Sequence, residues 1–192
     1  MITKPSWGGK DSLRTPSPHL HRAPRRRLLL YVSDGGRRVS PESMELVLEV
    51  LDILRRKHDS QICLTISGLE KWPELGSPPG GISFRSAAPD VESVILVDGH
   101  DLLVALPGLS SNGLPEALSR GVPCVAVRAS EMSVAITPGV TGAVVEDGNA
   151  PELAAAIASV LVNDDIYRSC FERAPAMAAY FSWTRIACRR EG

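Results

Sequence analysis

Short apolar runs alternate with amphipathic segments along most of the chain. The first run, Leu28–Val32, is apolar throughout, which is typical of a strand covered on both faces. The segment after it predicts a helix: Ser40 can cap it, Pro41 suits its first position, and apolar residues then recur at helical spacing up to Arg55. Further apolar runs predict strands at Ile62–Ile66, Ile82–Phe84, Leu102–Leu106, Pro123–Val127 and Gly142–Val145.

Two later segments also have helical character. Leu114–Arg120 predicts a short helix, and Asn149 or Ala150 begins a longer one with Pro151 in its first turn. Residues from about 164 onward predict one or two more helices.

The alternation of strands and helices defines the fold class. Strands and helices joined by short loops predict a doubly wound, Rossmann-like α/β domain, with a parallel sheet and helices on both faces. Ligands of such sheets bind beyond the carboxyl ends of the strands. We therefore expect the function in four loops, which follow Val32, Ser67, Phe84 and Leu106.

Composition and charge limit the domain organisation. The chain has 192 residues, 44% hydrophobic and 22% charged, which is typical of one globular domain with at most a tail. Residues 1–40 hold nine of the 21 basic residues but two of the 22 acidic ones, so the rest is acidic. We interpret residues 1–26 as a flexible basic leader and residues 27–192 as the domain, and the net charge of −1 argues against nucleic acid as a partner. Arg25–Arg27 either contact phosphate or an acidic membrane surface, or are solvated.

The sequence offers little for a membrane span, a disulfide or a metal. No apolar run approaches the roughly 20 residues of a membrane-spanning helix. The four cysteines lack CxxC spacing, and Cys63 and Cys124 fall in strand-like runs where a reduced, buried thiol is expected. We therefore expect a cytoplasmic protein, with membrane contact at most peripheral, and neither a bound metal nor another cofactor.

The loop after Leu106 carries the most specific candidate chemistry. It crosses a turn of small residues and enters a helix, so its backbone N–H groups form a candidate phosphate site. Glu116 follows in the first turn of that helix, where it either favours the helix dipole or accepts hydrogen bonds from the hydroxyls of a ribose. The candidate phosphate-binding residues of the turn are Ser110, Ser111, Asn112, Gly113 and Leu114.

Four segments carry a resemblance to a known family. The run GLPEALSRGVPCVA at 113–126 resembles the donor-site segment of retaining glycosyltransferases of the two-domain GT-B type, family 4 or group 1. The segments DLLVALP at 101–107, PGVTGAVVEDGN at 138–149 and FSW at 181–183 resemble neighbouring parts of the same domain, in the same order. The resemblance covers about residues 28–190, which is the C-terminal, nucleotide-sugar-binding domain of the family.

This resemblance implies transfer of a sugar from a nucleotide-sugar donor, with retention of configuration and without a metal. Glu116 matches the glutamate that holds the ribose. Backbone amides of the turn would bind the diphosphate, with Arg37 or Arg38 assisting. In the family an N-terminal domain supplies the acceptor site, which residues 1–26 cannot do, so a further domain or a partner chain would have to supply it.

The sequence also departs from the family pattern. The family's first donor-site glutamate falls on Gly108 by strict spacing, or on Asn112 if the loop is shortened. Glu42 stands at the position of a phosphate-binding lysine, and Arg37 and Arg38 are either substitutes for the lost cations or solvent-exposed. The alternative function is therefore a truncated or degenerate non-catalytic module that binds a nucleotide or a protein partner. No catalytic residue is assigned, and enzymatic activity stays open.

Overall fold

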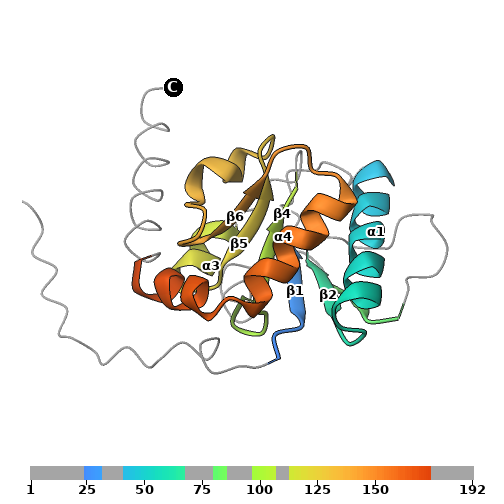
Figure 1. The fold of residues 1–192 in the computed structure, drawn as a ribbon, viewed down its shortest axis with the longest axis horizontal. Helices are drawn as coiled ribbons and strands as arrows, with labels where there is room; N and C mark the ends of the chain where they lie inside the picture. Colours follow the sequence, from blue (N-terminus) through green and yellow to red (C-terminus); the bar gives the residue numbers. More distant parts are fainter. Residues whose placement is uncertain (1–23, 32–40, 68–79, 86–96, 107–112, 174–192) are drawn as a thin grey trace, which may run out of the picture.

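A single parallel sheet forms the centre of the domain (Figure 1). The computed structural model describes residues 24–31, 41–67, 80–85, 97–106 and 113–173. Within these residues six strands follow the spatial order β3-β2-β1-β4-β5-β6, and every neighbouring pair is parallel. In chain order the strands are β1 (Arg27–Tyr31), β2 (Cys63–Ser67), β3 (Ile82–Arg85), β4 (Leu102–Ala105), β5 (Cys124–Val127) and β6 (Gly142–Val145).

The strand order reverses between β1 and β4. From β1 the chain runs outward through β2 to β3, and then returns to β4 on the other side of β1. This is the topology of a doubly wound sheet, and it confirms the predicted fold class. All six strands lie within one or two residues of the apolar runs that predicted them.

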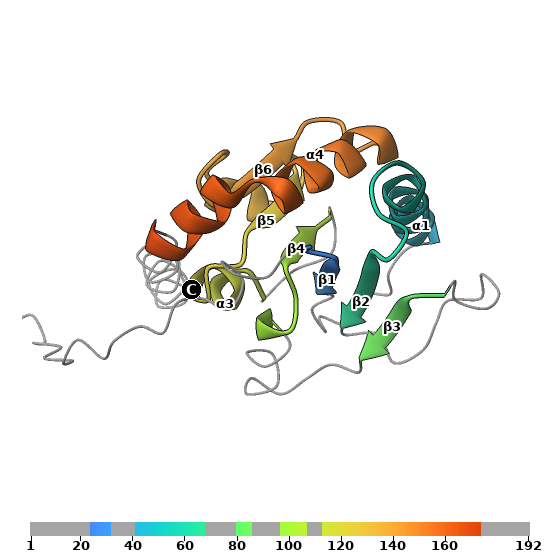
Figure 2. The same ribbon diagram turned by 60° about the horizontal axis from the view of Figure 1, so that its bottom comes forward.

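Helices cover both faces of the sheet (Figure 2). Helix α1 (Pro41–Lys57) and helix α4 (Ala150–Val162) lie side by side on one face, and the short helix α3 (Gly113–Ser119) lies on the other. A 3-10 turn, η1 (Glu131–Ala135), follows β5, and residues 164–173 are helical. The Asn149 side chain accepts a hydrogen bond from the N–H of Glu152, which confirms the expected start of α4.

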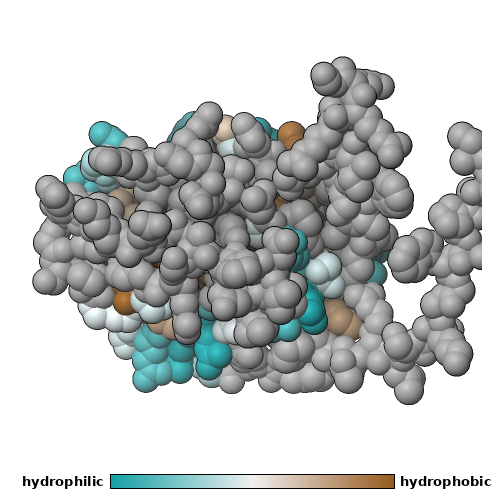
Figure 3. All heavy atoms as spheres, turned by 180° about the vertical axis from the view of Figure 1, so that it is seen from behind, coloured by the Kyte–Doolittle hydropathy of each residue, from teal (hydrophilic) through white to brown (hydrophobic). Residues whose placement is uncertain are grey.

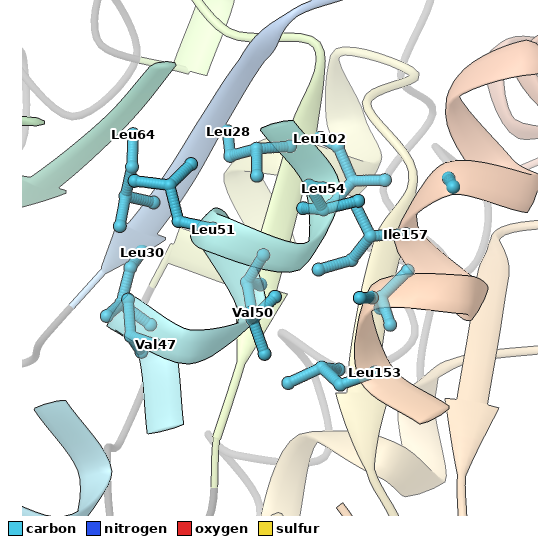
Figure 4. Close-up of a cluster of buried hydrophobic side chains, with 14 of the residues drawn as sticks. Leu28, Leu30, Val47, Val50, Leu51, Leu54, Leu64, Leu102, Leu153 and Ile157 are labelled. Atoms are coloured by element: carbon cyan, nitrogen blue, oxygen red, sulfur yellow. The ribbon is translucent and has the colours of Figure 1, made fainter. Parts of the chain in front are cut away.

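Alternation along the strands separates the core into two layers. Leu28, Leu30 and Leu64 point toward α1 and α4, where they meet Leu51 and Ile157 (Figure 4). The residues between them in sequence point to the opposite face. There Leu29 and Leu103 join a second cluster with Leu114 and Leu118 of α3. The sheet is therefore buried on both sides, as its continuous apolar strands require.

The start of the described chain packs against the domain. The Arg25 side chain is 5% exposed; its guanidinium donates to the Leu161 carbonyl and the Asp164 carboxylate and lies 3.8 Å from the centre of the Tyr167 ring. Arg26 pairs with Asp59. Arg25 is therefore enclosed by partners that are distant in the sequence, whereas Arg26 is paired but partly exposed. Residues 1–23 of the expected leader lie outside the described residues.

The described surface carries few large apolar side chains. Among the coloured residues of Figure 3, hydrophilic and hydrophobic ones both show, and the hydrophobic ones form no large continuous patch. In the part of the chain that the structure describes, Val134 and Val162 are the large hydrophobic residues with high exposure. None of the described helices is both long and apolar enough to cross a membrane.

Candidate functional site

The carboxyl edge of the sheet is the place where the topology predicts a ligand. Neighbouring strands β1 and β4 are followed by helices on opposite faces of the sheet, α1 after β1 and α3 after β4. All four loops in which we expected function lie outside the described residues. The candidates Ser110, Ser111, Asn112, Arg37 and Arg38 belong to these loops, so they stay predictions. The structure places the remaining three, which are Gly113, Leu114 and Glu116.

Helix α3 is held in place by core packing, and its first turn lies at this edge. Leu114, Ala117 and Leu118 are at most 2% exposed and pack into the second core layer. Gly121 ends the helix with a φ of +72°, and its N–H donates to the Leu118 carbonyl at 3.0 Å. Glu116, in the first turn, is therefore carried by a helix whose position the core fixes.

The carboxylate of Glu116 is incompletely satisfied. The residue is half-buried, and its Oε2 atom is buried without a hydrogen-bond partner. A carboxylate that only complements a helix dipole can remain in water, where it loses no hydration. Burial of an unpaired carboxylate oxygen costs free energy unless a ligand supplies the missing donor. This geometry favours the ligand-binding interpretation of Glu116 over the dipole interpretation.

A second unpaired polar atom lies at the same edge. Ser67 is the last residue of β2 and is fully buried, and its Oγ atom has no hydrogen-bond partner. A functional loop was expected after Ser67, but no role was expected for Ser67 itself. The available signal was a hydroxyl at the carboxyl end of an otherwise apolar strand.

An open cleft of about 500 Å³ lies at the opposite edge, beside the C-terminal ends of α1 and α4. Its two aspartates are already paired, Asp164 with Arg25 and Asp59 with Arg26. A hydrogen bond from the Gln61 N–H and the Arg26 guanidinium lower the pKa of Asp59. The cleft therefore offers paired carboxylates, whereas the carboxyl edge offers an unpaired one.

The described residues contain no group of three or more His, Cys, Asp or Glu side chains that could hold a metal ion. Cys63, Cys124 and Cys170 are free thiols. Burial raises the pKa of Cys170 to about 12 and raises that of Cys124 further. These two thiols are buried core residues that do not form the reactive thiolate near neutral pH.

The family model described as "Glycosyl transferases group 1" matches residues 22–177. The chain belongs to this family, which confirms the resemblance found in the sequence. The six-stranded parallel sheet is the Rossmann-like half of a GT-B fold.

Individual relatives agree with this assignment. The chain is 29% identical over 157 residues to D-inositol 3-phosphate glycosyltransferase of Corynebacterium jeikeium (strain K411). That alignment covers 74% of this chain but 37% of the relative, so the chain spans well under half of that protein.

Solved structures share the fold at lower identity. WaaG, a glycosyltransferase involved in lipopolysaccharide biosynthesis, is 20% identical with a TM-score of 0.65, covering 82% of this chain and 44% of WaaG. HepE of Anabaena, in complex with UDP and glucose, is 19% identical with a TM-score of 0.61, covering 81% of this chain and 44% of HepE.

Proposed function

We propose that the carboxyl edge of this domain binds the nucleoside diphosphate part of a sugar donor, with Glu116 accepting hydrogen bonds from the ribose hydroxyls. Membership of a glycosyltransferase family supports this role, as does the similarity in fold to HepE, which was solved with UDP and glucose. The observation that carries the proposal is the buried Glu116 Oε2 without a partner. A vicinal diol supplies two adjacent O–H donors, and a carboxylate with a free oxygen is their natural acceptor.

The rest of the proposed chemistry follows from the charge of the donor. Backbone amides of residues 110–114 hold the diphosphate, and Arg37 or Arg38 assists. In a retaining transfer without a metal, stabilisation of the leaving diphosphate by such fixed donors lowers the barrier. The acceptor site comes from a second domain or a partner chain.

The test is a calorimetric titration of the purified chain with UDP, GDP and ADP. We expect one of them to bind, and Glu116→Ala to weaken that binding about tenfold or more, because hydrogen bonds to a charged group are lost. The thermal stability without nucleotide should be unchanged or raised, since the substitution removes an unpaired carboxylate.

A matched charge control separates the local effect from a general one. Glu49 is an exposed carboxylate on α1. This helix covers the face of the sheet opposite to α3, which carries Glu116. Glu49→Gln should leave nucleotide affinity unchanged, whereas Glu116→Gln lowers it. Equal effects of the two substitutions, or no effect of Glu116→Ala on a nucleotide that does bind, would refute the role of Glu116.

A second candidate function is a donor-binding module that does not itself transfer sugar. It is favoured by Glu42, an exposed carboxylate in the first turn of α1, where the family places a phosphate-binding lysine. A negative charge there repels a diphosphate. Glu42→Lys should strengthen the binding of the nucleoside diphosphate if this position still faces the phosphates; unchanged affinity would remove the argument for this second function.

A further inference from the structure

The unpaired hydroxyl of Ser67 differs from the other buried hydroxyls of the described residues. Thr65, Ser133 and Thr141 each have a side-chain hydrogen-bond partner inside the protein: Thr65 with His100 and Ser83, Ser133 with the Arg128 carbonyl, and Thr141 with the Thr137 N–H. Ser67 is 0% exposed, and its Oγ has none. Among these buried hydroxyls, the missing hydrogen-bond partner is therefore specific to Ser67 at the end of β2.

The unpaired atoms of Ser67 and Glu116 belong to the same side of the sheet. Side chains alternate along a strand, so Ser67 faces the same way as Thr65 and opposite to Leu64 and Ile66, which belong to the layer under α1. Thr65 is in register with Leu29, and Leu29 packs in the layer that α3 covers. Both unpaired atoms thus lie on the α3 side, at the carboxyl edge.

The two unpaired atoms come from separate elements of the domain. Ser67 ends β2, and Glu116 belongs to the helix that follows β4; β1 lies between these two strands. The two unpaired atoms therefore belong to different elements on the same side of the sheet. An extended ligand, such as a ribose with an attached planar base, carries polar groups for both.

We propose that the Ser67 hydroxyl hydrogen-bonds the nucleobase of the donor. This inference rests on the proposed function, because it takes the ribose at Glu116 as its starting point. A fully buried position disfavours the charged diphosphate, since burial of a charge costs far more than burial of a neutral polar group. The base is the uncharged polar part of the donor, and a hydroxyl can donate to its carbonyl or ring nitrogen and accept from its N–H.

Base selectivity follows from this contact. A site that hydrogen-bonds one pattern of donors and acceptors rejects bases that leave its polar atom unpaired. Ser67→Ala removes the hydroxyl together with its burial cost. The variant should therefore keep or gain thermal stability, while its preference for one base is reduced.

The experiment compares wild type, Ser67→Ala and Ser133→Ala in calorimetric titrations with UDP, GDP, ADP and the corresponding nucleosides. We expect Ser67→Ala to weaken the binding of the preferred nucleoside diphosphate about three- to tenfold. The binding of the corresponding nucleoside should weaken by the same factor. Affinities for the other two bases should change little. Ser133→Ala should lower the midpoint of thermal unfolding without changing any affinity, because its hydroxyl bonds within the chain.

The outcomes separate this inference from the proposed function. If no nucleotide binds the wild type, the proposed function fails, and the inference fails with it. If a nucleotide binds and Glu116→Ala weakens it while Ser67→Ala does not, the Ser67 inference alone is wrong. Three other results would also overturn the Ser67 inference. Ser67→Ala could weaken the binding of all three nucleoside diphosphates equally, or weaken the binding of diphosphates but not of nucleosides. It could also lower the thermal stability below that of wild type.

Discussion

The Tyr167 hydroxyl donates a hydrogen bond of 2.7 Å to the carbonyl oxygen of Asp101, joining positions 66 residues apart. The Asp101 carboxylate accepts from the backbone N–H groups of Arg26 and Arg27, both at 3.0 Å. The guanidinium of Arg25 stacks on the Tyr167 ring. Together these contacts fasten the helical segment 164–173 to the amino ends of β1 and β4, on the edge opposite the proposed nucleotide site.

Tyr167→Phe tests this fastening. The substitution keeps the ring and its stacking with Arg25 but removes a buried hydrogen bond, so it should lower the free energy of unfolding by about 1–2 kcal/mol. Urea denaturation followed by circular dichroism measures the change. Nucleotide affinity should stay as in wild type, since the altered edge is remote from Glu116. An unchanged urea midpoint would mean that the hydrogen bond contributes nothing to stability.

Two glycines that flank the turn before β6 should respond very differently to alanine. A Cβ on Gly142 would lie 1.7 Å from the Cys124 carbonyl oxygen, and φ there is +146°. Because that obstacle is backbone, Gly142→Ala should cost more than about 3 kcal/mol. Gly139 has nothing within 4 Å of such an atom and a φ of +76°, so Gly139→Ala should cost only the backbone strain, about 1 kcal/mol. Similar losses in thermal unfolding would contradict the close approach at Gly142.

The ion pair between Arg128 and Glu146 predicts a pH effect. Hydrogen bonds from Arg128, the shortest of them 2.6 Å, lower the pKa of Glu146 from its ordinary value of 4.5. A carboxyl whose pKa is lower in the folded state stabilises the fold above its unfolded pKa and loses that effect as pH falls through the folded value. The stability difference between wild type and Glu146→Gln should thus be constant from pH 7 to pH 5, and shrink below about 4.5. A difference that persists at full protonation would exclude this pair as its source.

The buried thiols should resist alkylation. Burial holds the pKa of Cys124 and Cys170 far above neutral pH, so neither forms the reactive thiolate. Native protein treated with iodoacetamide at pH 8 should stay unmodified at both positions, and protein in concentrated urea should be modified at both. Peptide mass spectrometry measures the two yields. Rapid native labelling of Cys124 would show that the centre of the sheet opens readily.

The fold was predictable because its signals are local. The strands around Leu103 and Val125 are continuous apolar runs, and Asn149 followed by Pro151 marks the start of α4 within three residues. The role of Arg25 was not predictable. Its partners Leu161 and Asp164 lie more than 130 positions away, and a Pro- and Arg-rich context resembles a solvated linker.

The candidate site was predictable in part. Glu116 stands in a segment with specific family resemblance, and its incomplete hydrogen bonding agrees with the expected role. The sequence could not show that Ser67 lacks a partner, because this depends on what neighbouring strands offer to its side chain. Arg37, Arg38 and residues 110–112 lie outside the described part of the chain, so their role in binding stays a prediction.

The most direct test of the central claim is an NMR titration of the isotopically labelled chain with UDP, GDP and ADP. We predict that one nucleotide shifts the amide signals of Ser67, Gly113, Leu114 and Glu116 and of their neighbours at the carboxyl edge, and leaves those around Arg25 and His58 in place. Shifts centred on the cleft beside Arg25, Lys57 and His58, or no shifts with any of the three nucleotides, would contradict a nucleotide site at the carboxyl edge.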